Sequence, residues 1–213
     1  MLTPRRWLPL AMALAFVGCR EPTAPSNEPR VLGEVASLAT VDSGLHMLQQ
    51  APGAPPLETY QVSFWAYQGQ ASTVVVHYQP AAGDTVGQPF LQFDIPEDGL
   101  RAGADGVRLQ QGDSVYVTLT IDSVTFSVNF QPSGVEFSKH VPAGLTLWYE
   151  NANPDLNGDG VVDATDQAML LRLAVWCRPV GTRSWLRLSS NNDATLPSIS
   201  TALYHFSEYA VSW

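Results

Sequence analysis

After residue 58 the sequence alternates short runs rich in Val, Tyr, Phe and Thr with Gly, Pro and Asp, a pattern typical of antiparallel β proteins. In the run at 114–121, Val115, Val117 and Leu119 alternate with polar or aromatic residues, so one face of that strand is expected to be buried. About nine such strands predict an all-β antiparallel sandwich. The expected strands are 60–67, 73–78, 90–95, 114–121, 124–130, 145–149, 173–177, 185–188 and 202–212.

Composition agrees with strands and turns. Only 15% of the 213 residues are charged, whereas Gly and Pro each occur 16 times, which argues against a helical bundle. The formal net charge of −9 makes nucleic acid an unlikely class of partner, because phosphate backbones demand basic surfaces.

The N-terminus has the pattern of an export signal. Arg5 and Arg6 precede an apolar stretch at 7–17 that is too short to span a bilayer. The sequence Phe16-Val17-Gly18-Cys19 resembles the lipobox of bacterial lipoproteins, in which a peptidase cuts before a lipidated cysteine. The resemblance implies a signal peptide at 1–18 and a membrane anchor through lipid on Cys19, and therefore a periplasmic or surface-exposed protein of the bacterial cell envelope. An ordinary secretory signal with an incidental cysteine is the alternative.

Residues 19–57 are rich in Pro and predict a solvated tether, within which 31–48 has enough apolar content for a short helix or a docked strand. With Cys19 lipidated, Cys177 has no cysteine partner within the chain. Its apolar neighbours indicate a buried thiol. At 64–67 apolar residues occur on both faces of the expected strand, so the second face is either covered by the tether or exposed for a ligand, a carbohydrate included.

The strongest chemical motif is the acidic segment 155–166. Calcium loops place oxygen ligands at positions 1, 3, 5, 7, 9 and 12, with a glycine at position 6 for a sharp turn. Gly160 occupies position 6, and the apolar Val162 at position 8 is expected to pack the loop onto the domain. The predicted Ca²⁺ ligands are Asp155, Asn157, Asp159, the carbonyl of Val161, Asp163 and Asp166.

This loop resembles the EF-hand of dockerins, in which the last ligand is Asp rather than Glu. The resemblance extends into a helical stretch from Ala164 to about Arg172. Dockerins carry two such repeats and bind cohesins, whereas this chain has one. Because Pro154 and a strand-like run stand where an entering helix would be, we expect the loop at 151–172 to be an insertion between two strands, with a structural calcium ion.

Three other segments occur in a familiar order: the one beginning Phe93-Asp94-Ile95-Pro96, the one beginning Phe130-Gln131-Pro132-Ser133, and the one at 205–211. Together they resemble the ZU-five family of β-sandwich domains, named for zonula occludens proteins and netrin receptors. The resemblance implies that residues 58–213 form one such sandwich and that the calcium loop lies in a variable connection of the fold.

Some animal relatives of that fold cleave themselves at a His-Phe-Ser tripeptide, which here is His205-Phe206-Ser207. Ser207 Oγ would attack the Phe206 carbonyl while His205 accepts the proton, and water would hydrolyse the resulting ester. The alternative is that Phe206 simply packs in the core and that His205 lies at the end of a strand.

No motif for an enzyme acting on a diffusible substrate occurs elsewhere in the sequence. The expectation is an exported, lipid-anchored, calcium-binding β-sandwich with a structural or binding role at the cell envelope. The alternatives are autoproteolysis at Phe206-Ser207 and a dockerin-like, cohesin-binding or carbohydrate-associated module.

Overall fold

The structure, a computed structural model, describes residues 40–41 and 45–213. The predicted signal peptide, Cys19 and most of the predicted tether lie outside these residues. The described residues form fourteen strands and one helix. The elements are β1 (Thr40–Val41), β2 (Gln61–Tyr67), β3 (Ser72–His77), β4 (Pro89–Ile95), β5 (Leu100–Ala102), β6 (Ser114–Asp122), β7 (Ser127–Gln131), β8 (Glu136–Phe137), β9 (Ala143–Trp148), α1 (Ala164–Leu170), β10 (Ala174–Arg178), β11 (Trp185–Arg187), β12 (Ser190–Asp193), β13 (Ser198–Leu203) and β14 (Glu208–Ser212).

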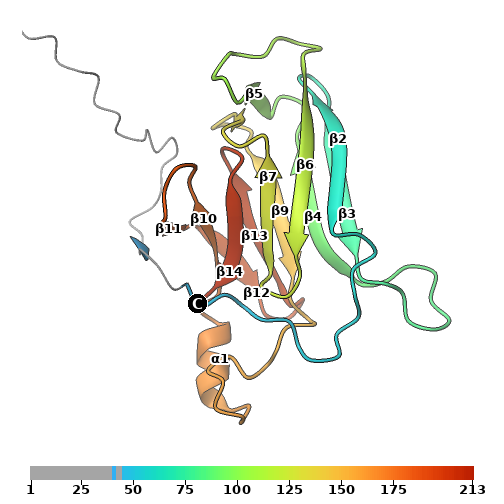
Figure 1. The fold of residues 1–213 in the computed structure, drawn as a ribbon, viewed down its shortest axis with the longest axis vertical. Coiled ribbons are helices and arrows are strands. Elements are labelled where there is room, and N and C mark those ends of the chain that lie inside the picture. The colour runs from blue at the N-terminus through green and yellow to red at the C-terminus, as the bar shows by residue number, and fades with distance from the viewer. Residues whose placement is uncertain (1–39, 42–44) are drawn as a thin grey trace, which may run out of the picture. The chain divides into compact units, whose positions relative to one another are not determined.

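Two antiparallel sheets form the fold, as predicted for an all-β sandwich (Figure 1). One sheet has the strand order β1-β11-β10-β14-β7-β6-β2, and the other has the order β12-β13-β9-β4-β3. A small third sheet pairs β5 with β8. In Figure 1, α1 lies at one end of the sandwich and β5 at the other.

Alternation along the strands buries the side chains that form the core. In β6, Val117, Leu119 and Ile121 are buried, whereas Tyr116 and Thr120 are exposed, as the sequence pattern predicts. Aromatic rings fill the centre of the core. The fully buried ring of Phe206 stacks on that of Phe130 at 5.1 Å and contacts the rings of Phe93 and Phe137.

The prediction of a single strand over 202–212 is wrong. Residues before 204 belong to β13 in the five-stranded sheet, and residues from 208 belong to β14 in the seven-stranded sheet. The chain therefore crosses from one layer to the other at 204–207. Alternation of apolar residues continues through this crossing because Phe206 points into the core shared by both sheets.

Residues 45–57 pack against the sandwich. Leu48 and Leu57 are fully buried in the main core. The backbone N–H of Leu48 donates a hydrogen bond to the carbonyl of Val211 at 2.8 Å. Apolar burial at these two leucines outweighs the Pro-rich composition between them.

The segment that contains residues 151–172 lies between two strands. It connects β9 in one sheet to β10 in the other and carries α1, which ends two residues earlier than expected. Within the described part of the chain, no helix has the length and apolar character needed to span a bilayer.

Candidate functional site

The acidic segment 155–166 folds as a compact loop held by its own side chains. Asp155 Oδ1 accepts a hydrogen bond from the N–H of Gly158 at 2.8 Å, and Asp155 Oδ2 accepts one from Gly160 at 2.9 Å. Gly158 and Gly160 have φ values of +74° and +86°, which the absence of a Cβ permits. Position 6 is thus the sharp turn that the sequence predicts.

The middle of the loop repeats the same kind of contact. Asn157 Oδ1 accepts from the N–H of Asp159 at 2.9 Å, and Asp159 Oδ1 accepts from the N–H of Val161 at 2.8 Å. Asn157 Nδ2 also donates to Asp159 Oδ2 at 2.9 Å. Side-chain oxygens at alternate positions therefore accept hydrogen bonds from backbone N–H groups of the same loop.

Asp166 closes the loop and caps the helix. Its carboxylate is buried and accepts hydrogen bonds from Leu156 at 2.8 Å and Asn157 at 3.2 Å on Oδ1, and from Asp163 at 2.8 Å on Oδ2. Asp163 is the N-cap of α1, and the two residues form a capping box. The N–H of Asp163 contributes most to lowering the pKa of Asp166, those of Asn157 and Leu156 add to it, and burial opposes them.

The donor set of this loop suits a hard cation, because all six predicted ligands offer oxygen. A carboxylate oxygen has about two lone pairs. The hydrogen bonds occupy both on Asp166 Oδ1 but leave one on Asp166 Oδ2 and on each Asp155 oxygen. Across residues 40–41 and 45–213, however, no three His, Cys, Asp or Glu side chains are already positioned around a point that a metal ion could occupy.

The residues that attach the loop to the sandwich differ from the one that the sequence predicted. Val162 is 54% exposed, so the prediction that it packs the loop onto the domain is wrong. Leu156 and Leu170 make that contact with the core instead. Asn192 Nδ2 donates to the carbonyl of Leu170 at 2.8 Å, and its Oδ1 accepts from the Tyr149 hydroxyl at 2.7 Å.

The candidate cleavage segment lies at the crossing between β13 and β14. The Phe206 N–H donates to the carbonyl of Val135 at 2.8 Å, and the Phe206 carbonyl accepts from the N–H of Gly134 at 3.1 Å. Ser207 Oγ is buried and makes no hydrogen bond to His205. Burial lowers the pKa of His205, which favours the neutral imidazole.

Cys177 lies opposite Tyr209 in the pairing of β10 with β14 and is buried, as predicted. Burial raises the pKa of its thiol to about 11, against the opposing influence of the Ser207 and Tyr209 hydroxyls. A protonated, enclosed thiol is a poor nucleophile. This cysteine therefore acts as a packing residue.

The outer face of β2 and β6 carries an aromatic pair. Trp65 is 54% exposed, Tyr116 is 52% exposed, and their ring centroids lie 5.1 Å apart. The neighbouring Ser63 and Thr118 hydroxyls are hydrogen-bonded at 2.9 Å. The sequence left open whether this face is covered by the tether or exposed. None of the described residues covers it.

Comparisons of the chain with models of known protein families, with curated proteins and with solved structures find no match.

Proposed function

We propose that this chain is an exported lipoprotein, anchored through Cys19, whose β-sandwich binds one calcium ion and has a structural or binding role at the bacterial cell envelope. The single observation that carries the calcium part of the proposal is the loop conformation, with side-chain oxygens at alternate positions around a turn at Gly160. Calcium takes six to eight oxygen ligands in flexible geometry, which such a loop supplies after small side-chain rotations.

Electrostatics supports the same proposal. Asp155, Asp159, Asp163 and Asp166 fall within twelve residues, and no Arg or Lys occurs in that segment. Four carboxylates at this spacing repel one another, and a divalent cation would relieve that repulsion. Since the loop packs on the core through Leu156 and Leu170, ordering it would stabilise the sandwich as well.

The test is thermal unfolding of the full-length chain in calcium and in chelator, with a native mass spectrum to count bound ions. At a calcium concentration of one hundred times Kd, linkage predicts about 2.7 kcal/mol of added stability. Asp159→Asn retains an acceptor for the Val161 N–H but removes one charge and the exposed acceptor of the Asn157 amide, so it should lower Tm slightly in chelator and by clearly more in calcium. Glu150→Gln, an exposed residue with the same change of charge, is the control. Equal losses in calcium and in chelator would refute the calcium assignment.

The lipid anchor has a separate test. Cys19→Ala should move the protein from the membrane fraction to the soluble fraction of cells that express it. Retention of the variant in the membrane fraction would refute anchoring through this residue.

A carbohydrate-associated role is a second candidate, and the exposed pair Trp65 and Tyr116 is the observation that favours it. Aromatic faces stack on the apolar faces of sugar rings, and hydroxyls beside them can donate and accept hydrogen bonds. Trp65→Ala should abolish retention on insoluble neutral polysaccharide, whereas Val86→Ala, an exposed apolar residue elsewhere, should not. Equal retention of both variants would reject this role.

Autoproteolysis at Phe206-Ser207 is a third candidate, favoured by the Gly134 N–H that donates to the Phe206 carbonyl. In this reaction Ser207 Oγ forms an ester with the Phe206 carbon as the peptide C–N bond breaks. The Ser207 amine leaves with the proton held by His205, and water then hydrolyses the ester. The mass of the denatured chain tests it. A C-terminal heptapeptide that disappears in Ser207→Ala would support cleavage, and an intact chain alone would refute it.

A further inference from the structure

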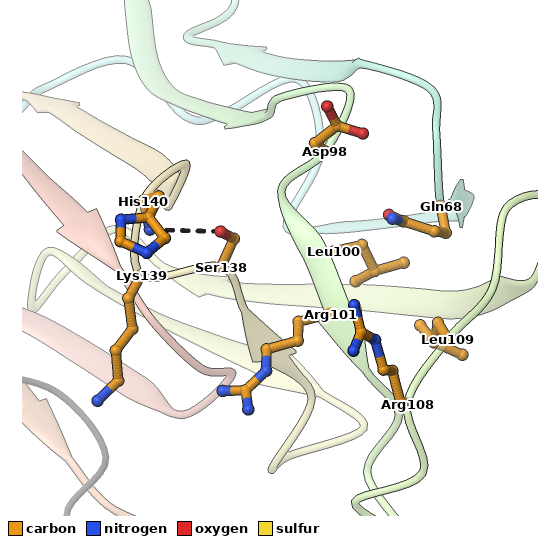
Figure 2. A pocket seen from close by; sticks show the side chains of 9 residues that line it. All are labelled: Gln68, Asp98, Leu100, Arg101, Arg108, Leu109, Ser138, Lys139 and His140. Carbon is orange, nitrogen blue, oxygen red and sulfur yellow. Dashed lines mark hydrogen bonds between the residues drawn. The ribbon is translucent and has the colours of Figure 1, made fainter.

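A pocket of about 510 Å³ is lined in part by β5 (Figure 2). β5 lies at the end of the sandwich opposite α1, which follows the acidic loop (Figure 1). The walls of the pocket come from Gln68 just after β2, from Asp98, β5 and the return segment after it, and from the turn that follows β8. The volume is far larger than the roughly 30 Å³ that a water molecule occupies in the liquid and falls within the range of small-molecule sites.

Positive charge is concentrated around this pocket. Residues 45–213 contain seven Arg and Lys residues and sixteen Asp and Glu residues. Three of those seven bases, Arg101, Arg108 and Lys139, line this one cavity, against a single lining carboxylate, Asp98. An otherwise acidic domain therefore presents three of its seven basic residues around one cavity.

Two of the three cations have no counterion within the described part of the chain. Arg101 pairs with Glu136 at 3.5 Å, but neither Arg108 nor Lys139 forms an ion pair with any described residue. The Arg101 and Arg108 backbones are neighbours, because Ala102 bridges to Arg108 and the Leu109 N–H donates to the Arg101 carbonyl at 2.9 Å. Two guanidinium groups on adjacent backbones repel each other unless an anion lies between or beside them.

The backbone around the pocket is held in place before any ligand arrives. Ser138 donates its N–H to the carbonyl of Gly99 at 2.7 Å, and its Oγ accepts from the N–H of His140 at 3.3 Å (Figure 2). The pairing of β5 with β8 joins the two basic walls. Binding would therefore order side chains rather than backbone, which reduces its entropic penalty.

The remaining lining is polar and mixed in character. Asp98 is an acceptor, Ser138 and His140 each combine donor and acceptor capacity, and only Leu100 and Leu109 are apolar. The Gln68 amide oxygen is buried without a hydrogen-bond partner among the described residues, and Gln68 is one of the residues that line the pocket. Acceptors beside the cations require a ligand that brings hydrogen-bond donors as well as negative charge.

We propose that this pocket binds a small hydroxylated carboxylate of the size of an acidic sugar, with the carboxylate at Arg108, a hydroxyl at Asp98, and Lys139 contributing positive charge from the opposite wall of the pocket (Figure 2). The guanidinium fork of Arg108 matches the two oxygens of a carboxylate, and Lys139 adds a point charge. None of the residues of this site belongs to the acidic loop or to the aromatic pair. The result of its test is therefore independent of the tests of the proposed function.

The experiment is a titration of the full-length chain at constant ionic strength with glucuronate, glucose and inorganic phosphate, followed by calorimetry or by NMR of the arginine side chains. Glucuronate should bind saturably, and glucose and phosphate should each bind at least about tenfold more weakly. Arg108→Gln should weaken glucuronate binding by about tenfold, and Lys139→Gln should weaken it by less, because Lys139 adds charge from the opposite wall. Arg183→Gln, an exposed arginine outside the pocket, should leave it unchanged.

Asp98→Asn separates recognition of hydroxyls from simple attraction of anions. Removing this charge should strengthen phosphate binding, because a like charge is gone, and should lower the preference for glucuronate over phosphate. Failure of glucuronate to bind saturably, binding unaffected by Arg108→Gln, or phosphate binding as tight as that of glucuronate in the unmodified chain would each overturn the proposal.

Discussion

The carboxylate of Asp166 accepts a hydrogen bond from the backbone N–H of Leu156 at 2.8 Å, so the last residue of the acidic loop holds the second one in place. Asp166→Asn would replace one acceptor oxygen with an NH₂ group that faces a backbone donor. We expect a lower Tm in calcium and in chelator alike, together with faster hydrogen exchange at Leu156 and Asp163, because these contacts do not require a metal ion. Glu150→Gln is the matched control. Unchanged exchange at both amides would contradict this role.

Asn192 joins the helix of the insertion to the five-stranded sheet by accepting from Tyr149 and donating to the Leu170 carbonyl. Asn192→Ala should lower the free energy of unfolding by about 1 to 2 kcal/mol, because two partly buried hydrogen bonds are lost. Denaturant unfolding measures this change. The exposed neighbour Asn191→Ala should have almost no effect, and equal losses in both variants would argue against the anchor.

Phe206 has its ring at the meeting point of three other phenylalanine rings in the core. Phe206→Ala should destabilise the fold by about 3 to 5 kcal/mol through lost burial and the cavity left behind. Phe206→Leu should lower the stability by less than half as much. Leu196→Ala, at a side chain that is 66% exposed, provides the control in the same chemical denaturation. A small effect of Phe206→Ala would mean that the core closes around the missing ring.

Ionisation of the Cys177 thiol should lower the free energy of unfolding at alkaline pH. Burial raises the pKa of its thiol to about 11, whereas in the unfolded chain the thiol ionises at about 8.5. The stabilising contribution is therefore complete below about pH 8 and is lost as the pH rises toward about 11, by up to about 3 kcal/mol.

The variant Cys177→Ala isolates this effect. The buried tyrosines Tyr78 and Tyr209, whose pKa values are also raised, remain in both proteins. The free energy of unfolding of the unmodified chain minus that of Cys177→Ala should decrease as the pH rises from about 8 to about 11. A difference independent of pH would show that the thiol does not ionise differently in the folded chain.

The fold class could be predicted from the sequence because strand periodicity is a local property. The alternation in β6 decides which of its faces is buried before any partner strand is known. The turn at Gly160 was predictable for the same reason, since its positive φ is imposed within a few residues. The prediction of one strand over 202–212 was wrong, because local alternation does not reveal that the chain passes from one sheet to the other.

The candidate sites also differ in how close together their residues lie in the sequence. The loop at 155–166 could be predicted because its donors are close in sequence, at fixed spacing. Its anchor at Asn192 could not be, because Asn192 lies 22 residues from its partner Leu170 and looks like an ordinary turn residue. The basic pocket left no local signal, since Gln68, Arg101 and Lys139 reach one cavity from three separate segments.

The sequence by itself determined the all-β class, the acidic loop and the burial of Cys177, because these follow from neighbours within a few residues. Only the tertiary structure decided that residues 45–57 pack on the core, that none of the described residues covers Trp65 and that three scattered cations line one pocket. Those outcomes depend on which distant strands pair and on how two sheets stack. Long-range pairing is set by the free energy of the whole core, which no short stretch of sequence contains.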